Sequence, residues 1–286
     1  MGLPNLSYMM KVGQIRHIQA QYEIPGARNP DTLVRHLLTP RERFACAVRG
    51  RFLLGKLRAN PFYYYVLART RYYDALFEQA IADGHRFILN IGCGGDTRAY
   101  RWRDQLKKSD VIMVECDQRM AIEQKARLAH RRLQADHVQY MAIDLNDRSW
   151  PDLDQWLRRH AGHSGFVMLE GVSPYIDRSS FEAFLRMLAD GLAPGSRMAY
   201  DYKLAGVADE FGRLDADMQP FRLGADATQS ATFHASVGLA QVHHELGAAL
   251  VDRLVPNAMR QGYPSFEEDA LVQLMVAGPT TGRRVP

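Results

Sequence analysis

The stretch "NIGCGGDTRAYRW" (residues 90–102) decides the fold of this chain. It continues the nearly all-apolar run "RFILNIG" (residues 86–92), which is typical of a buried parallel strand, and it leads into a predicted helix from about Thr97. Gly92 and Gly94 have the spacing that lets the backbone turn tightly and a ligand approach the main chain. A dinucleotide-binding turn carries a third glycine where Thr97 stands here. The turn therefore favours a ligand that has no pyrophosphate.

Strands and helices alternate after this turn. Predicted helices near residues 119–133, 149–159 and 179–192 separate short apolar runs, and this order predicts an α/β fold whose parallel sheet carries helices on both faces. The last strands are expected at "GAALVDRLV" (residues 247–255) and "ALVQLMVAG" (residues 270–278), and residues 204–247 are expected to form a lid or a pocket wall. The further apolar runs are "VIMVECD" (111–117), "VQYMAID" (138–144), "GFVMLEG" (165–171) and "SRMAYDY" (196–202).

The region before the first strand has a helical pattern. Residues 1–30 are expected to form an irregular arm with one short helix near residues 9–20. Residues 29–61 show helical spacing that Pro40 is expected to interrupt, and residues 62–84 predict a helix that ends at Gly84. We therefore divide the chain into an N-terminal helical cap (residues 1–84) and a ligand-binding core (residues 85–286).

Composition narrows the class of protein. The 286 residues carry a formal net charge of +4, too little to indicate nucleic-acid binding, and no apolar run approaches the length of a membrane helix. The three cysteines lie far apart without metal-ligand spacing, which favours a reducing cytoplasm. Between Arg35 and Arg58 there are seven basic residues and one acid, Glu42. This segment is either a solvated helix face or a basic cap that attracts an anionic substrate.

Acidic residues follow the predicted strands, where ligands bind in sheets of this kind. Asp117 ends the second strand and suits the two hydroxyls of a ribose, although Glu115, on the same side of the strand, competes for that role. After the third strand, the carboxylate of Asp144 and the amide of Leu145 suit an adenine edge, but Asp144 also suits a helix N-cap.

The fourth strand ends in "MLEGVSPY" (residues 168–175). A carboxylate such as Glu170 at the end of an apolar strand is costly unless it is partnered or lies at a cleft, and Tyr175 is expected in a loop over that cleft. Together the acids and the turn describe a site for an adenosine without phosphate. S-adenosylmethionine fits this description.

The motifs resemble those of the leucine carboxyl methyltransferase-like family, whose bacterial branch includes natural-product O-methyltransferases. They are "LARTRYYD" (residues 67–74), the glycine turn, "VECDQ", "AIDLND" and "LEGVSPY", in the family's order and spacing. The resemblance implies a class I methyltransferase fold, Rossmann-like, with a seven-stranded, mostly parallel sheet, and S-adenosylmethionine as cofactor. It also implies that Arg69 holds the methionine carboxylate, Gly92 and Gly94 line the methionine, Asp117 binds the ribose, Asp144 and Leu145 face the adenine, and Glu170 binds the methionine amine.

The reaction stays open between three hypotheses. The first is methyl transfer to a carboxylate or hydroxyl of a small, anionic secondary metabolite, with Tyr175 orienting the reactants and no metal required. The second is cyclisation of S-adenosylmethionine itself, which releases methylthioadenosine, with Tyr175, Tyr200 and Tyr202 as an aromatic wall. The third is an inactive cofactor-binding module. We expect a cytoplasmic monomer or homodimer without a nucleic-acid or membrane partner.

Overall fold

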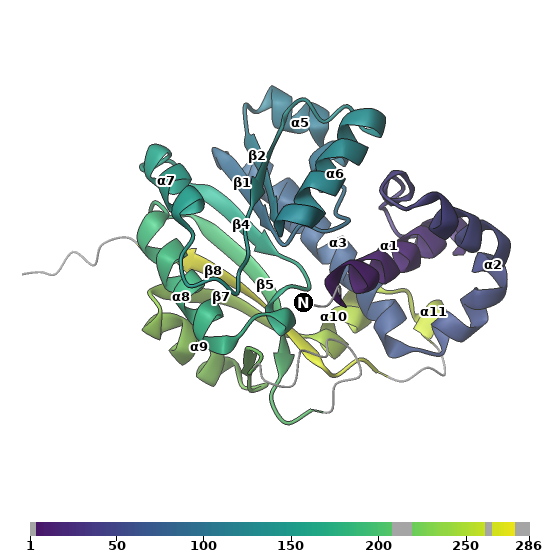
Figure 1. The fold of residues 1–286 in the computed structure, drawn as a ribbon. Helices are drawn as coiled ribbons and strands as arrows, with labels where there is room; N and C mark the ends of the chain where they lie inside the picture. The colour runs from purple at the N-terminus through teal and green to yellow at the C-terminus, as the bar shows by residue number, and fades with distance from the viewer. Residues whose placement is uncertain (1–3, 208–218, 261–264, 278–286) are drawn as a thin grey trace, which may run out of the picture.

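An eight-stranded sheet forms the centre of the protein (Figure 1). The computed structural model describes residues 4–207, 219–260 and 265–277. The order along the sheet is β3-β2-β1-β4-β5-β8-β7. The first five strands run parallel, β8 runs opposite to them, and β7 pairs antiparallel with β8 and so runs in the direction of the first five. The strands are β1 (Phe87–Ile91), β2 (Ile112–Asp117), β3 (Val138–Ala142), β4 (Gly165–Leu169), β5 (Arg197–Leu204), β6 (Arg222–Leu223), β7 (Leu239–Leu246) and β8 (Asp269–Val276). The predicted α/β class and parallel sheet are confirmed.

The predicted strand count was one too low. Seven strands form the continuous path, and the two-residue strand β6 pairs with the end of β5 beside it. A strand this short has no alternating pattern that a sequence could display.

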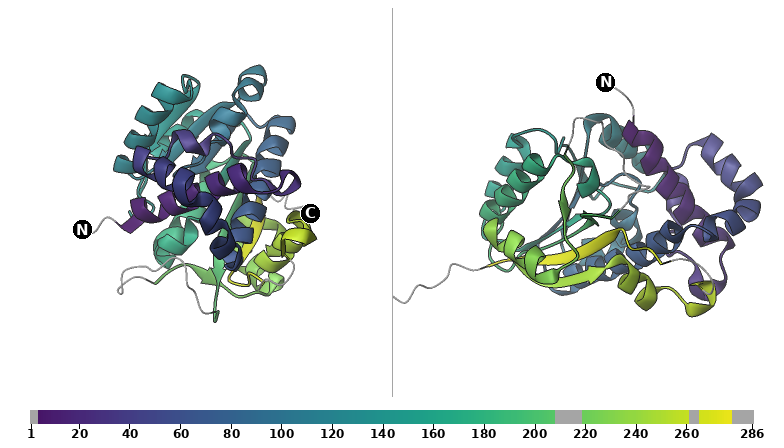
Figure 2. Two further views of the ribbon diagram at one scale, coloured as in Figure 1. Left: turned by 90° about the vertical axis from the view of Figure 1, so that its right-hand side faces the viewer. Right: turned by 90° about the horizontal axis from the view of Figure 1, so that it is seen from below.

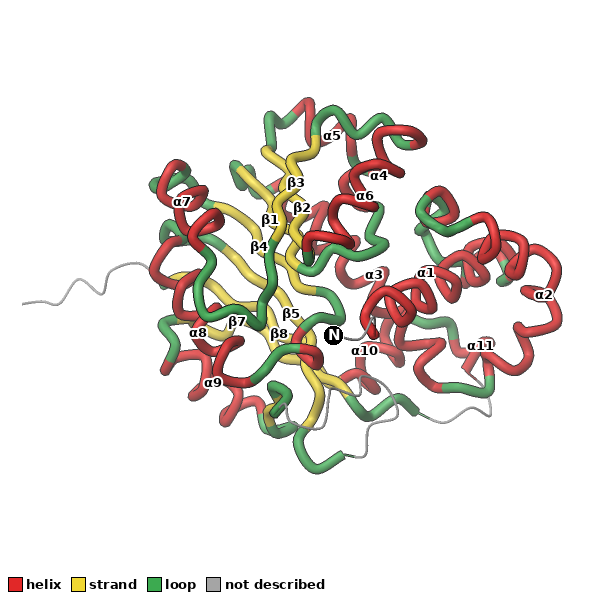
Figure 3. Tube along the Cα trace, in the orientation of Figure 1, coloured by secondary structure: helices red, strands yellow, loops and turns green. Residues whose placement is uncertain are grey.

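Helices cover both faces of the sheet (Figure 3). Side chains of β1 alternate, so that Ile88 joins the core beneath α3, while Leu89 and Ile91 join the core beneath α7 and α8. One face carries α3 (Pro61–Ala82), α6 (Arg119–Arg132) and α10 (Gly247–Leu254), and the other carries α7 (Pro151–Arg159), α8 (Arg178–Gly191) and α9 (Ala227–Ser236). Short helices complete the core: α4 (Arg98–Arg101), α5 (Arg103–Lys108), η3 (Ser173–Tyr175) and α11 (Asn257–Arg260).

Two N-terminal helices form a layer beside this core, α1 (Pro4–Tyr22) and α2 (Pro40–Arg58), joined through the short turns η1 (Pro25–Ala27) and η2 (Val34–His36) (Figure 2, left). The predicted helix at residues 9–20 is therefore longer than expected. Pro40 begins α2 rather than interrupting a helix, because proline at the first helical position needs no amide partner. Thr39 and Glu42 close a reciprocal capping box around this start.

The basic residues of α2 lie mostly in solvent. Arg58 differs, because its guanidinium pairs with the buried carboxylate of Glu23 at 2.5 Å. The exposed basic side chains of this helix are Arg41, Arg43, Arg49, Arg51 and Lys56. This arrangement matches the interpretation of the segment as a solvated helix face.

The C-terminal elements differ from the predicted ones. Residues 247–254 form helix α10, not a strand, and its buried Leu250 and Val251 pack in the core that α3 also enters. The strand beside β8 is β7, in the segment that was expected to be a lid or pocket wall. The predicted strand at residues 270–278 is confirmed as β8 over its described part. None of the helices described here is long and apolar enough to cross a membrane.

Candidate functional site

The glycine turn after β1 requires glycine at its first position. Gly92 has a φ of +65°, and a Cβ built there would lie 2.5 Å from a methyl carbon of Val172. Gly94 also has a positive φ, of +41°, and its N–H donates a 2.7 Å hydrogen bond to Asp117 Oδ2. The turn is thus shaped by packing against the β4 loop and by a bond to the end of β2. Both predicted glycines lie at the carboxyl edge of the sheet.

The two acids of β2 have different surroundings. Glu115 is fully buried, and its carboxylate accepts 2.7 Å hydrogen bonds from Lys125 Nζ and the Tyr100 hydroxyl. Asp117 lies at the strand end, where each carboxylate oxygen accepts one backbone N–H, from Gly94 and from Gln118. A carboxylate has about four lone-pair directions, so Asp117 retains capacity for further hydrogen bonds. Glu115 also accepts two hydrogen bonds, so the two acids differ in position: Glu115 is enclosed within the sheet, whereas Asp117 lies at its carboxyl edge.

The candidate adenine residues follow β3. Asp144 accepts hydrogen bonds from the Asn146 amide at 3.0 Å and from Gln118 Nε2 at 3.1 Å. The N-cap of α7 is Trp150, so Asp144 does not cap that helix. The Leu145 side chain is buried in the core. Gln118, which directly follows Asp117 at the end of β2, thus connects that strand end to the loop after β3.

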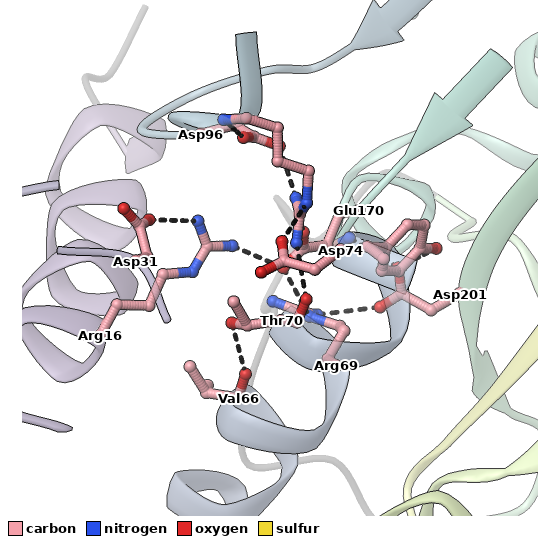
Figure 4. A network of polar contacts seen from close by, with 12 residues as sticks. Arg16, Asp31, Val66, Arg69, Thr70, Asp74, Asp96, Glu170 and Asp201 are labelled. Atoms are coloured by element: carbon pink, nitrogen blue, oxygen red, sulfur yellow. Dashed lines mark hydrogen bonds and ion pairs between the residues drawn. The ribbon is translucent and has the colours of Figure 1, made fainter. Parts of the chain in front are cut away.

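Glu170, at the end of β4, lies at the centre of a buried ion-pair network (Figure 4). One carboxylate oxygen lies 2.5 Å from Arg16 Nη2 and 3.3 Å from Arg69 Nε, and the other lies 2.6 Å from Arg98 Nη1. Burial by itself raises the pKa of the Glu170 carboxyl, but Arg16, Arg98 and Arg69 outweigh it and lower the pKa to about 2. Glu170 is therefore ionised across the whole neutral range.

The side chain of Arg69, on α3, contacts both Glu170 and Asp201. Its Nη1 donates to Asp201 Oδ2 at 2.9 Å, while its Nε is buried without a hydrogen-bond partner. Gly171 makes room for this guanidinium, since its φ is +69° and an added Cβ would lie 3.0 Å from both terminal nitrogens of Arg69. The Arg69 side chain is buried, and the β4 loop is shaped around it.

The network as a whole is acidic. In the described structure it joins four arginines to five carboxylates, one more negative group than positive. Burial raises the pKa of Asp31, although Arg101 and Arg16 oppose that rise. The arginines are Arg16, Arg69, Arg98 and Arg101, and the carboxylates are Asp31, Asp74, Asp96, Glu170 and Asp201. Such an arrangement is electrostatically suited to a ligand with net positive charge.

Arg16 is a residue of this site that the sequence did not indicate. It lies on α1, is 6% exposed, and its Nε has no hydrogen-bond partner. The buried polar residues Arg16, Gln19 and Glu23 recur at three- and four-residue spacing along α1. That spacing is the signal in the sequence: a polar stripe that faces inward when the helix lies over a charged site. Through Arg16, α1 contacts Glu170 and covers its carboxylate.

Tyr175 lies in η3, after β4, and is half-buried against the core formed with α8. Its carbonyl accepts a 3.2 Å hydrogen bond from Asn146 Nδ2, which ties the β4 loop to the loop after β3. Tyr200 and Tyr202 do not form a wall with it. They are buried in β5, and their hydroxyls bond His234 and His244, because alternate residues of that strand point away from Asp201.

Within residues 4–207, 219–260 and 265–277, no group of three or more histidine, cysteine or acidic side chains is arranged to hold a metal ion. The charged groups at the sheet edge are instead paired with one another or with backbone amides.

Comparison with known proteins identifies the relatives of this chain. A family model described as leucine carboxyl methyltransferase matches residues 17–189. A protein of Mycolicibacterium smegmatis, named as an S-adenosyl-L-methionine-dependent methyltransferase, is 32% identical over 155 residues, which are 52% of this chain and 48% of that protein. A protein of Streptomyces coelicolor with the same kind of name is 28% identical over 154 residues, 51% of each chain. The chain spans about half the length of the curated relatives it matches.

Solved structures show a more distant likeness. Magnesium protoporphyrin IX methyltransferase of Synechocystis, solved with bound S-adenosylmethionine, is 11% identical, with a TM-score of 0.45 over 73% of this chain and 80% of that one. A protein of Bordetella parapertussis is 18% identical, with a TM-score of 0.46 over 96% of both chains.

Proposed function

The chain belongs to the leucine carboxyl methyltransferase family, and we propose that it binds S-adenosylmethionine and methylates an oxygen of a small, anionic secondary metabolite. The observation that carries this proposal is the charge of the buried network. At neutral pH, S-adenosylmethionine has an ammonium, a sulfonium and a carboxylate, and hence a net charge of +1. The network has one carboxylate in excess, at the carboxyl edge of the sheet where ligands bind.

The residues present fit this cofactor. Asp117 retains lone pairs for the ribose hydroxyls. Arg16 and Arg69 both contact Glu170, and the Nε atom of each forms no hydrogen bond, so both guanidiniums retain a donor for an amino-acid head group held there. We assign the methionine carboxylate to Arg69 and the amine to Glu170. Gly92 and Gly94 would lie along the methionine, and Asp144 with Leu145 would face the adenine. When bound, the cofactor supplies an electrophilic methyl group on a positively charged sulfur.

The protein's task in methyl transfer is mainly positioning. A carboxylate acceptor is already a nucleophile and needs no general base, so the acceptor oxygen must be held in line with the methyl carbon and sulfur. Arg16 holds α1 over the buried Glu170 side chain, so we propose that α1 shields the cofactor's head group from bulk water. We propose that Tyr175 orients the acceptor or faces the sulfonium with its ring, since aromatic faces attract cations.

Arg16 provides a test of the cofactor's placement. We expect Arg16→Gln to weaken binding of S-adenosylhomocysteine about tenfold, the loss of one buried charged contact worth ~1.5 kcal/mol. Binding of methylthioadenosine is expected to stay unchanged, because that ligand has no amino-acid head group. Calorimetric titration of both ligands measures the difference. Equal losses for the two ligands would show that Arg16 acts on folding or on the adenosine end instead.

A second candidate is cyclisation of S-adenosylmethionine, in which its amine attacks its own γ-carbon. The packing of α1 over Glu170 suits this reaction, because cyclisation needs no second substrate and hence no acceptor pocket.

One experiment separates the two candidates. The purified protein is incubated with S-adenosylmethionine, alone and with a set of small carboxylic acids and phenols, and the products are identified by mass spectrometry. S-adenosylhomocysteine together with a methylated acid supports methyl transfer. Methylthioadenosine formed without any acceptor supports cyclisation and would overturn the methyl-transfer proposal. Binding of the cofactor with no product under any condition would favour an inactive binding module.

A further inference from the structure

A cavity of about 260 Å³ lies outside the ion-pair network, between the start of α2 and the second half of α6. Its apolar wall comes from Leu38 and Pro40 on the cap side and from Leu128 on α6. Arg127, Arg131 and Arg132 of α6 line it as well. The volume is slightly below the ~300–1,000 Å³ of pockets for drug-sized ligands, which limits an occupant to a small molecule.

The positive charges at this cavity lack carboxylate partners. Arg132 Nη1 donates to the His36 carbonyl at 2.7 Å and Arg127 Nε to the Glu123 carbonyl at 3.3 Å, both uncharged acceptors. In the described part of the chain, none of the three arginines forms an ion pair. The nearby carboxylate of Glu42 is occupied by the backbone and hydroxyl of Thr39. The cavity thus combines an apolar wall with uncompensated positive charge.

The helix ends beside the cavity add little net charge. The N-terminal end of α2, at Thr39 and Pro40, carries about half of a positive elementary charge, and the C-terminal end of α6 carries about half of a negative one, so the two roughly cancel and the arginines set the sign. The pKa of His36 is lowered, first by burial and then by Arg35, Arg132 and Arg43. Burial is the largest cause of this lowering, and the three arginines add to it, so His36 gives only secondary support for a positive potential near the cavity.

A second cavity adjoins this one on the side of the glycine turn. It has a volume of about 50 Å³, shares the lining residues Leu38, Gln124 and Leu128, and is also lined by Gly94 and Gly95 of the turn. A Cβ at Gly95 would meet no atom within 4 Å. The outer cavity therefore lies next to the turn whose Gly94 is bonded to Asp117.

We propose that this cavity binds the acceptor of the reaction, a small monoanion with an apolar body, and that Arg127 and Arg131 attract its charge. The assignment of this cavity to the acceptor rests on the proposed methyl-transfer function. The sequence suggested that the basic segment of residues 35–58 attracts an anionic substrate. The structure assigns that task to α6 instead, because the exposed arginines of α2 do not line the cavity.

The test compares hexanoate with hexanamide, its uncharged counterpart, by protein-observed NMR titration. We expect the wild-type protein to bind hexanoate at least tenfold more tightly than hexanamide, and we expect added salt to reduce the difference. Arg127→Gln/Arg131→Gln is expected to reduce hexanoate affinity about tenfold and to leave hexanamide affinity unchanged. Arg119→Gln is the matched control, since that side chain is 77% exposed on the same helix and does not line the cavity.

The affinity for S-adenosylhomocysteine should be the same in all three proteins, because neither Arg127 nor Arg131 belongs to the cofactor network. Equal binding of hexanoate and hexanamide, or hexanoate binding that the double variant retains, would overturn the proposal. If the double variant methylates an anionic acceptor with an unchanged KM, the proposed acceptor site is wrong, but the proposed function still holds. If hexanoate binds in the expected pattern but the protein transfers no methyl group, the proposed function is wrong, but the anion-binding site still holds.

Discussion

Replacing Arg98 by glutamine is expected to lower the free energy of unfolding by about 3–5 kcal/mol, the range for breaking a buried ion pair by removing one partner. The Arg98 side chain is fully buried. Its guanidinium lies 2.7 Å from Asp74, 2.6 Å from Asp96 and 2.6 Å from Glu170, and it also donates to the Thr70 carbonyl at 3.0 Å. Glutamine has too few donors to satisfy three carboxylates, so negative charge is left buried and uncompensated.

The loss should depend on pH in a defined direction. In the wild-type protein the pKa of Glu170 is about 2, below its ordinary value of 4.5, so its stabilisation is complete above pH 4.5 and is lost as the pH falls toward 2. Without Arg98 the neighbouring carboxyls have raised pKa values. A carboxyl whose pKa is higher in the folded than in the unfolded protein stabilises the folded state at low pH, and this stabilisation is lost as the pH rises. The difference between variant and wild type should therefore shrink as the pH is lowered from 7.5 to 5.

Urea denaturation at several pH values measures both effects. Arg158→Gln is the control, because Arg158 lies on the surface of α7 and pairs with Asp154 four residues before it; its unfolding midpoint should stay unchanged. An Arg98→Gln protein as stable as the wild type, or one whose deficit grows on acidification, would contradict the assignment of Arg98 as the counter-charge of the network.

The parallel strands could be predicted because burial on both faces gives them a distinct sequence. Residues 87–91 and 165–169 are apolar apart from Asn90 and Gly165, and every side chain in both strands is buried. Asp117 and Glu170 could be proposed as site residues for a related reason, since an acid at the end of such an apolar run stands out. Their place at the sheet edge follows from the parallel topology.

The C-terminal elements were misread because their patterns are ambiguous. The run "GAALVDRLV" is short and apolar, and a run of that length is compatible with a strand or a buried helix. The segment forms a helix because it packs against α3, which lies about 180 residues earlier in the sequence. The strand β7 lies at the sheet edge, and its sequence "LAQVHHEL" is only partly buried. It therefore lacks the apolar run that marked the inner strands.

The network around Glu170 could not be predicted because its members come from distant segments. Arg16, Asp74 and Asp201 look like ordinary surface residues in their own helices or strands, and only the docking of α1 on α3 and the sheet brings them together. Charged residues are almost never fully buried unless they are paired, so the expectation for each one alone was solvent exposure. The same reasoning explains why Glu115 and Asp117 were indistinguishable: the partner of Glu115, Lys125, lies on the next helix.

Replacing Asp117 by alanine is expected to weaken binding of S-adenosylhomocysteine about 100-fold. The proposed contact is a pair of hydrogen bonds from the ribose hydroxyls to one carboxylate, each worth ~1.5–3 kcal/mol when the acceptor is charged. Two bonds at the lower end of that range, ~3 kcal/mol together, correspond to slightly more than two factors of ten in affinity. The substitution also removes the acceptor for the Gly94 and Gln118 amides, so part of the loss would come from the glycine turn.

A pair of ligands separates these two contributions. The wild-type protein should bind adenosine at least tenfold more tightly than 2′,3′-dideoxyadenosine, which lacks both hydroxyls. In Asp117→Ala this preference should fall close to one, whereas a loss that acts only through the turn would weaken both ligands equally and preserve the ratio. Asp147→Ala is the control, because Asp147 is an exposed acid at the same edge of the sheet. A preserved ratio in Asp117→Ala would mean that another residue binds the ribose hydroxyls and that Asp117 only holds the glycine turn in place.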